Sequence, residues 1–316
     1  GRIGDRNPMK VGIIITSAIV LVIGALLIVA MLGSPDKPSR LTADPAVLQI
    51  HTLPNNLPQV AIVKGGGNAE ALYDEAIAFY QAEITQFSGE GTPKQDVADH
   101  MADLLIRAME AGDVSRPFLD KYLGTTISPR QSKFGNAMSD IPVAMMRYAQ
   151  DLYHERDEKA QAIMIARAVW TLGRRAHERC IRLINRFQGL QAMTLSGTDL
   201  YNWSGEGTPL AAQIDPWIPP INDLQAAWKD KLEIVLATRW ERLGDLMNIA
   251  MNDQDLSFRV EATLRLGLAR WSPKTSANLR YIEKYLKNAS NSENQALADA
   301  AKAALQMTAQ DVRNIY

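Results

Sequence analysis

The sequence predicts an all-α protein with an N-terminal single transmembrane helix and an α-helical extramembrane domain, either solenoid-like or irregular. Three observations carry this prediction. The segment from Val11 to Leu32 has no charged residue. Most of the remaining chain places apolar residues three and four positions apart, which is the period of an amphipathic helix. Near the C-terminus, two Ala- and Leu-rich segments share one pattern.

The apolar segment 11–32 is long enough to cross a membrane. As an α-helix, its 22 uncharged residues match a hydrocarbon core of roughly 30 Å. A cleaved signal peptide is the alternative, but its apolar region usually has about 7–15 residues and a small-residue cleavage site. The sequence Met31-Leu32-Gly33-Ser34 fits such a site poorly. We therefore expect a retained single-pass anchor that contacts the lipid bilayer, preceded by a short basic tail at residues 1–10.

Basic residues on the two sides of this segment indicate its orientation. Arg2, Arg6 and Lys10 precede it, and Lys37 and Arg40 follow it. Because basic residues near a span favour the cytoplasmic side, this balance predicts a cytoplasmic N-terminus and an extracytoplasmic C-terminal domain, periplasmic in a bacterium.

Residues 33–68 are expected to form a stalk. It begins polar and rich in proline, and two short apolar runs follow, separated by Pro54-Asn55-Asn56. These runs either pair as short strands or lie extended against the helical body. The glycines at 65–67 predict a flexible joint.

Residues 69–253 are expected to form a helical domain. The second helix should begin at Thr92-Pro93, where threonine caps and proline takes the first position. Residues 113–139 are expected to be irregular, and residues 195–220 read as a long loop, which is uncommon without a function. The helices are predicted at about 69–87, 92–112, 141–153, 157–193 and 222–251.

The last part of the chain, residues 254–316, contains the repeated pattern. One unit runs through Val260 and Leu264 to Leu268, and the other through Leu297 and Ala301 to Leu305, 37 residues later. This spacing, with small residues between the anchors, resembles the second helix of HEAT-type repeats. The resemblance implies helix pairs that stack into an α-solenoid.

A second repeat is exact: the hexapeptide Ser-Gly-Glu-Gly-Thr-Pro occurs at residues 88–93 and again at 204–209. It reads as a turn ending in a helix cap, as a trace of internal duplication, or as a Gly-x-Gly loop that binds an anion. Glu90 and Glu206 oppose the last reading because each places a carboxylate where the anion would lie.

No motif in the sequence indicates catalysis, a cofactor or a metal. The chain lacks a Gly-x-Ser-x-Gly elbow, a Walker loop and paired cysteines. Asp151 and His154 form a single carboxylate–histidine pair, whereas a di-metal site in a helical bundle needs two such pairs. Cys180 falls on an apolar stripe and is expected to be a buried, inert thiol, while His154 and His177 are expected near the surface.

Arginines and tryptophans are the candidate partner-binding residues. Four arginines at 4-3-4 spacing form a predicted ridge that either receives an acidic partner or lipid headgroups, or makes internal salt bridges. Two tryptophans in the predicted loop either mark a contact surface or pack onto the helices. The residues are Arg175, Arg179, Arg182, Arg186, Trp203 and Trp217.

Together these features predict a non-catalytic, membrane-anchored helical scaffold, an accessory or assembly subunit whose partners are other proteins of a membrane complex. No nucleic-acid partner is expected, because no aromatic platform is interleaved with the arginines. One alternative is a membrane-anchored enzyme whose site lies between the long helices and residues 195–220, near His154 and His177. The other is a module that binds a small ligand or an envelope polymer.

Overall fold

The computed structural model describes residues 41, 43–60, 68–112, 114–115, 119–123, 136–236 and 240–315. Helices connected by turns make up this part of the chain, and none of its residues forms a strand. This confirms the all-α prediction for the described residues. Among them, no helix has both the length and the apolar character needed to cross a membrane. The predicted anchor at 11–32 and the glycine joint at 65–67 lie outside them.

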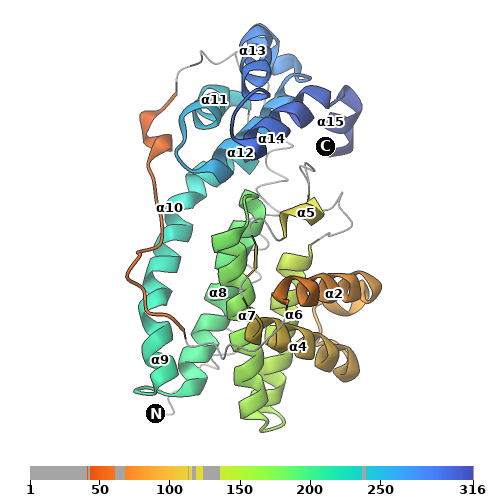
Figure 1. Ribbon diagram of the computed structural model, residues 1–316, viewed down its shortest axis with the longest axis vertical. Helices are drawn as coiled ribbons and strands as arrows, with labels where there is room; N and C mark the ends of the chain where they lie inside the picture. Colours follow the sequence, from red (N-terminus) through yellow and green to blue (C-terminus); the bar gives the residue numbers. More distant parts are fainter. Residues whose placement is uncertain are drawn as a thin grey trace, which may run out of the picture.

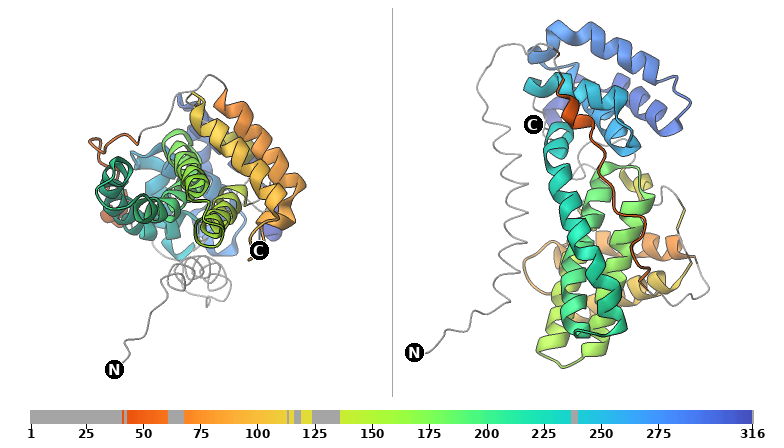
Figure 2. Two further views of the ribbon diagram at one scale, coloured as in Figure 1. Left: turned by 90° about the horizontal axis from the view of Figure 1, so that it is seen from below. Right: turned by 90° about the vertical axis from the view of Figure 1, so that its left-hand side faces the viewer.

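The described helices form an elongated molecule (Figures 1 and 2). The α-helices are α2 (Ala69–Ala82), α3 (Ile84–Phe87), α4 (Gln95–Glu110), α5 (Asp120–Leu123), α6 (Ala137–His154), α7 (Lys159–Arg179), α8 (Leu183–Ser204), α9 (Pro209–Ile214), α10 (Ile218–Leu236), α11 (Leu243–Asn252), α12 (Leu256–Ala269), α13 (Leu279–Ala289), α14 (Gln295–Gln306) and α15 (Ala309–Ile315). Short 3-10 helices are η1 (Pro45–Leu48), η3 (Asp215–Trp217), η4 (Trp240–Arg242) and η5 (Pro273–Asn278).

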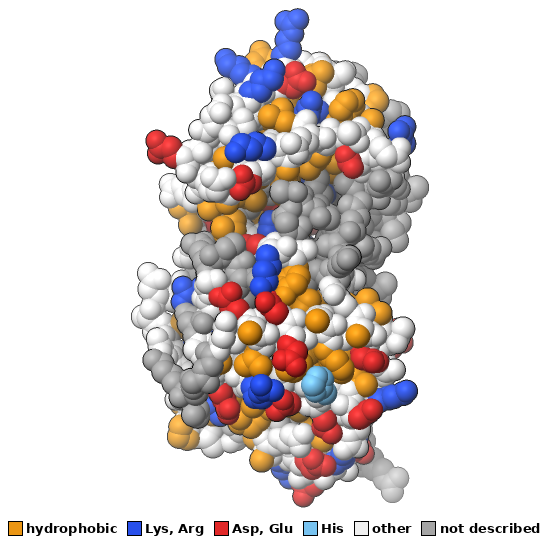
Figure 3. All heavy atoms as spheres, turned by 45° about the vertical axis from the view of Figure 1, so that its right-hand side comes forward, with side chains coloured by type: hydrophobic (Ala, Val, Ile, Leu, Met, Phe, Trp, Pro, Cys, Tyr) orange, Lys and Arg blue, Asp and Glu red, His pale blue; other side chains and the backbone are white. Residues whose placement is uncertain are grey.

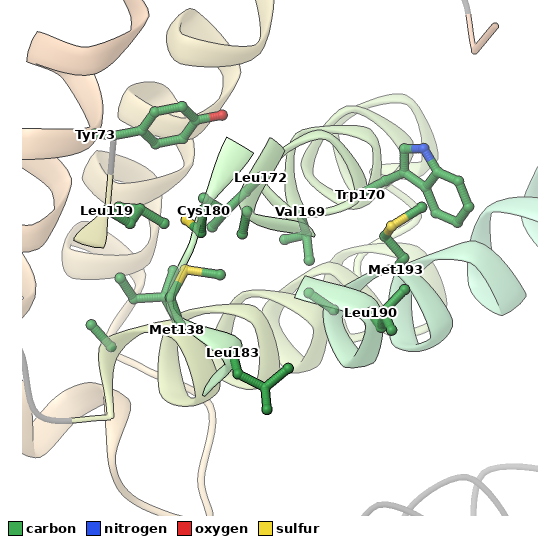
Figure 4. Close-up of a cluster of buried hydrophobic side chains, with 14 of the residues drawn as sticks. Tyr73, Leu119, Met138, Val169, Trp170, Leu172, Cys180, Leu183, Leu190 and Met193 are labelled. Carbon is green, nitrogen blue, oxygen red and sulfur yellow. The ribbon is translucent and has the colours of Figure 1, made fainter. Parts of the chain in front are cut away.

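The lower half of the molecule is a bundle around α7 and α8. Helices α4 and α6 pack on this pair, α2 packs on α4, and α10 packs on α8 (Figure 1). Figure 4 shows side chains from several elements meeting in its interior, among them Val169, Leu172 and Leu190. All three are almost fully buried. Burying such side chains is the main stabilising contribution to the bundle.

The upper half contains α11 to α15. Helix α12 lies against both α11 and α14, and α13 packs on α14. A Cβ atom on Gly267 of α12 would lie 2.7 Å from Cα of Ala304 in α14, so glycine permits this close approach. The two segments with the repeated pattern therefore lie side by side as α12 and α14. Whether they belong to HEAT-type repeats stays a prediction.

The predicted helix 157–193 is in fact a helical hairpin, which corrects the sequence interpretation. Its chain breaks at residues 180–182, and α7 and α8 then pack along each other. A Cβ atom on Gly173 would lie only 2.6 Å from the carbonyl oxygen of Gly189. Glycine at both positions therefore lets the two backbones approach closely.

The predicted loop at 195–220 is also wrong, because most of it is helical. Helix α8 continues to Ser204, and α9, η3 and the start of α10 follow after a short turn. The helix predicted at 222–251 is correspondingly divided, since α10 ends at Leu236 and α11 begins at Leu243. Glycines and prolines here mark helix ends and first turns rather than a long loop.

The described part of the predicted stalk lies extended along the helical body, apart from η1 (Figure 1). Side chains from η3 and α10 hold it by donating to its backbone carbonyls. Trp217 Nε1 donates to Pro58 O at 2.8 Å, and Trp228 Nε1 donates to His51 O at 3.2 Å. Of the two sequence alternatives, residues 43–60 therefore take the extended course and not a strand pair.

Candidate polar junction between the two halves

Three of the four arginines that the sequence singled out, Arg175, Arg182 and Arg186, lie inside the molecule, near the junction of the two halves, and Arg179 is partly exposed. Arg175 and Arg182 are buried, and Arg186 is mostly enclosed. They therefore do not form an exposed ridge. Their guanidinium groups bind partners within the chain, which was one of the two sequence alternatives.

Arg175 closes the C-terminal end of α4. Its guanidinium donates to the carbonyl oxygens of Ala108 at 2.6 Å, Ala111 at 3.2 Å and Gly112 at 3.1 Å, and to Tyr73 Oη at 3.1 Å. The last carbonyls of a helix have no partners within the helix, and a cation is favourable there. Arg175 thus joins α7 to α4 and α2.

Arg182 connects the hairpin to the upper half through a buried carboxylate. Its Nε lies 3.3 Å from Glu261 Oε2 in α12, and Arg265 Nε lies 3.8 Å from the other oxygen of the same carboxylate. The Glu261 side chain is only 1% exposed. Two guanidinium groups therefore compensate one buried negative charge.

Arg186 makes the second connection, beside a histidine and a tryptophan. One of its terminal nitrogens lies 2.8 Å from both oxygens of Asp255 and from Ser257 Oγ, and its Nε donates to His177 O at 3.1 Å. The guanidinium carbon also lies 5.1 Å from the ring centroid of Trp228. Burial raises the pKa of Asp255, but the charge and hydrogen bonds of Arg186, together with the bond from the Ser257 amide and the charge of Lys231, lower the pKa overall.

A third ion pair, between Lys231 of α10 and Asp253, is also buried. The ammonium group also donates to Gln49 O at 3.4 Å, so it reaches the extended segment. Burial raises the pKa of Asp253, although its bond from Lys231 acts in the opposite direction. We name Arg182, Arg186, Lys231, Asp253, Asp255, Glu261 and Arg265 the polar junction.

Asp120 supports the junction from the short helix α5. Its carboxylate accepts from the backbone amides of Ile181 and Arg182 and from Asn185 Nδ2 at 3.0 Å. Arg182 is the N-cap of α8 and offers no side-chain cap of its own. Burial raises the pKa of Asp120, and these hydrogen bonds oppose that shift. Asp120 therefore supplies, from a distant part of the sequence, the acceptor for the two backbone amides at the break just before α8.

The two histidines of the alternative enzyme reading are not brought together. His154 ends α6 and is exposed, whereas His177 lies near the end of α7. Along α7, His177 lies eighteen positions after Lys159, a rise of about 27 Å at 1.5 Å per residue. The expectation that His177 lies near the surface is wrong, because its ring is buried against Trp228.

The two tryptophans pack onto helices. Trp203 stacks on Tyr153 with ring centroids 4.7 Å apart and lies 6.2 Å from the His154 ring. Trp217 is 7% exposed and meets Trp170 edge-to-face at 5.8 Å. Both rings thus contribute to internal packing of the segment predicted to be a loop.

Cys180 is buried, as predicted. The thiol is free and fully buried at the end of α7, where Figure 4 shows it beside Leu119, Leu172 and Met138. Burial, together with the nearby Asp120 carboxylate, raises the pKa of the Cys180 thiol well above its ordinary value. Such a thiol is unreactive because it is seldom ionised.

An open cleft of about 490 Å³ lies between α4 and α7, away from the junction. Carboxylates line it, namely Asp99, Asp103 and Glu158. Asp99 is engaged, because Tyr148 Oη donates to it at 2.6 Å. Within the described ranges, no group of histidine, cysteine and carboxylate side chains has the arrangement of a metal site.

The chain matches no protein-family model, and neither a curated protein nor a solved structure is significantly similar to it.

Proposed function

We propose that this protein is a membrane-anchored helical scaffold, an accessory or assembly subunit that holds other proteins of a membrane complex. In this proposal, residues 11–32 span the bilayer with the N-terminus in the cytoplasm. The helical body lies on the extracytoplasmic side and acts through its surface rather than through a reaction.

The polar junction is the observation that carries the proposal. Its three arginines and one lysine, which are the groups best suited to bind an acidic substrate, are instead paired with carboxylates of the same chain. These pairs connect α8 to α12 and α10 to residue 253, across the two halves of the body. A body fixed in this way presents its outer surfaces at constant distances, which is what a scaffold requires.

The enzyme alternative lacks a comparable observation. Its two histidines are far apart, and the Cys180 thiol is enclosed. The binding-module alternative is favoured by one feature, the acidic α4–α7 cleft. Asp103 and Glu158 at this cleft are exposed, although Asp103 also pairs with Arg107 at 3.0 Å. The cleft therefore suits a Lys- or Arg-bearing segment of a partner protein, which also fits the scaffold.

The proposal is tested on the tagged full-length chain purified from its native membrane in a mild detergent. Alkaline carbonate extraction first establishes whether the chain is integral to the membrane. Quantitative mass spectrometry then compares the native chain with the double variant Asp103→Lys/Glu158→Lys. The control is Asp299→Lys, a reversal of one exposed carboxylate of α14 in the other half.

We expect the chain to resist carbonate and to carry partners in stoichiometric amounts. At least one partner should be reduced about tenfold or more by the cleft variant and retained by the control, because reversing two charges at an interface opposes binding. Extraction by carbonate contradicts the anchor. An integral protein that purifies without stoichiometric partners contradicts the scaffold.

A further inference from the structure

The outer face of α13 is basic. Arg280, Lys284 and Lys287 are exposed and follow one another at four- and three-residue spacing, so they share one side of the helix. Tyr281, 62% exposed, lies beside them. The opposite side of the helix is apolar, with Ile282 and Leu286 fully buried. We name these four exposed residues the α13 basic face.

The charges of this face are not neutralised by the described residues. The carboxylate of Glu283, in the same helix, lies 3.7 Å from Arg270 of α12. Among the residues that the structure describes, none of the three basic side chains of the face makes an ion pair. Figure 3 shows Lys and Arg side chains gathered at the end of the molecule that carries α13, and many Asp and Glu side chains over the opposite half.

The face is held rigidly. Tyr285, one residue from Lys284, donates from its hydroxyl to Ala250 O at 2.9 Å and lies 2.7 Å from Thr263 Oγ1. These bonds connect α13 to α11 and α12. Because the helix cannot turn about its axis without breaking them, its basic side points away from the body.

The start of the described chain places this face near the predicted anchor. The backbone amide of Asp44 donates to Asp245 of α11 at 2.7 Å, and η1 packs on the same helix. The chain thus joins the body in the upper half, which also carries α13 (Figure 1). Only residues 33–43 separate Asp44 from the end of the predicted anchor, and eleven residues reach at most about 40 Å.

We infer that the α13 basic face docks on the anionic phospholipid headgroups of the membrane that the anchor crosses. The inference rests on the proposed anchor, because the short linker keeps the face within reach of the bilayer. Basic side chains are attracted to anionic lipid, and an exposed tyrosine is suited to the membrane–water interface. When the face is docked, the long axis of the body points away from the membrane. The acidic half then remains accessible to partner proteins.

The test uses the full-length chain reconstituted into vesicles. A fluorescent donor is attached at Asn288→Cys, beside the basic face, and energy transfer to an acceptor-labelled lipid is measured. Cys180 is fully buried and does not compete for the label. The reference position is Glu155→Cys, in the turn between α6 and α7 at the other end of the molecule.

Vesicles of phosphatidylcholine alone are compared with vesicles in which about a third of the lipid is phosphatidylserine. The charge variant is Arg280→Glu/Lys284→Glu/Lys287→Glu. A matched variant with the same change in net charge, Lys94→Glu/Arg107→Glu/Lys159→Glu, alters exposed cations of the lower half.

We expect phosphatidylserine to increase transfer at residue 288 and not at residue 155. Each basic residue should change the ratio of docked to undocked protein about fivefold, so the α13 variant should abolish the increase and the matched variant should retain it. Added salt should weaken it. If energy transfer at residue 288 does not depend on phosphatidylserine, or falls equally in both charge variants, this inference is overturned and the proposed anchor is unaffected. Extraction by carbonate overturns both.

Discussion

His177 is neutral in the folded protein because its ring is enclosed. Burial and the neighbouring Arg186 charge lower the pKa of His177 to about 3, although the nearby Asp255 carboxylate and the Arg186 carbonyl oppose the shift. In the unfolded chain the pKa is about 6.5. Between these values only the unfolded state binds the proton, so the free energy of unfolding falls as the pH falls.

We predict that protonation of His177 in the unfolded chain causes part of this fall in the free energy of unfolding. From pH 6.5 to 4.5 its contribution decreases by about 2–3 kcal/mol, close to 1.4 kcal/mol per pH unit. His177→Asn keeps a donor for the Arg186 carbonyl but carries no titratable group. The difference between the two proteins in urea denaturation, followed by circular dichroism across this pH range, should therefore shrink toward low pH.

Comparing the native protein with His177→Asn cancels a second contribution to the pH dependence of the free energy of unfolding, which has the opposite sign. The raised pKa values of Asp120 and Asp253 make the folded state bind protons more tightly, so their contribution to stability grows as the pH falls and is lost as the pH rises. These carboxylates are present in both proteins, and their effect cancels. If the free energies of unfolding of the two proteins changed in parallel with pH, protonation of His177 would not explain the loss of stability in acid.

At the scale of elements, the two identical hexapeptides adopt different structures. In the second copy, Thr208 accepts from the amide of Ala211 at 3.3 Å and Pro209 begins α9, as the turn reading predicts. In the first copy α4 begins only at Gln95, so the predicted Thr92 cap is wrong. There, Arg147 of α6 donates to Gly89 O at 2.7 Å, so contacts outside the hexapeptide differ between the copies.

The copies provide a matched pair of glycines. Gly207 has a φ of +82°, whereas Gly91 has no positive φ, and a Cβ on either would meet nothing within 4 Å. Gly207→Ala should lower the free energy of unfolding by about 1–2 kcal/mol, because a left-handed backbone conformation is unfavourable for residues with a Cβ. Gly91→Ala should be neutral or slightly stabilising, because it restricts the unfolded chain. Equal effects of the two substitutions in urea denaturation would contradict this assignment.

At the scale of the whole molecule, buried charges connect the two halves. Glu261→Ala removes the carboxylate shared by Arg182 and Arg265 and leaves two buried guanidinium groups. We expect the free energy of unfolding to fall by about 3–5 kcal/mol. The control is Glu283→Ala, whose partner Arg270 lies 3.7 Å away and whose side chain is 36% exposed. A more exposed pair is worth at most about 1 kcal/mol.

Both variants are compared in urea denaturation of the detergent-solubilised chain. A loss at Glu261 no larger than that at Glu283 would show that the junction does not hold the halves together. In that case the halves would be joined chiefly by α10 and the apolar contacts of α12, and the rigidity that supports the scaffold proposal would be lost.

The sequence determined the features that depend on local periodicity and composition. Apolar spacing predicted helices over most of the described chain, and the apolar stripe placed Cys180 in the core. These predictions hold because a helix repeats every 3.6 residues whatever surrounds it, and because apolar side chains leave water in any compact fold. The anchor prediction has the same basis and falls outside the described residues.

Only the tertiary structure decided where helices end and which charges pair. No proline or glycine stands at residues 180–182, so nothing local indicates the break between α7 and α8. The acceptor at that break is Asp120, some sixty residues earlier in the chain. Likewise, the arginine spacing indicated one helix face. The carboxylates that pair with those arginines come from a different element, Glu261 from within α12 and Asp255 from its N-cap. Contacts between distant residues depend on packing, and sequence spacing alone does not contain that information.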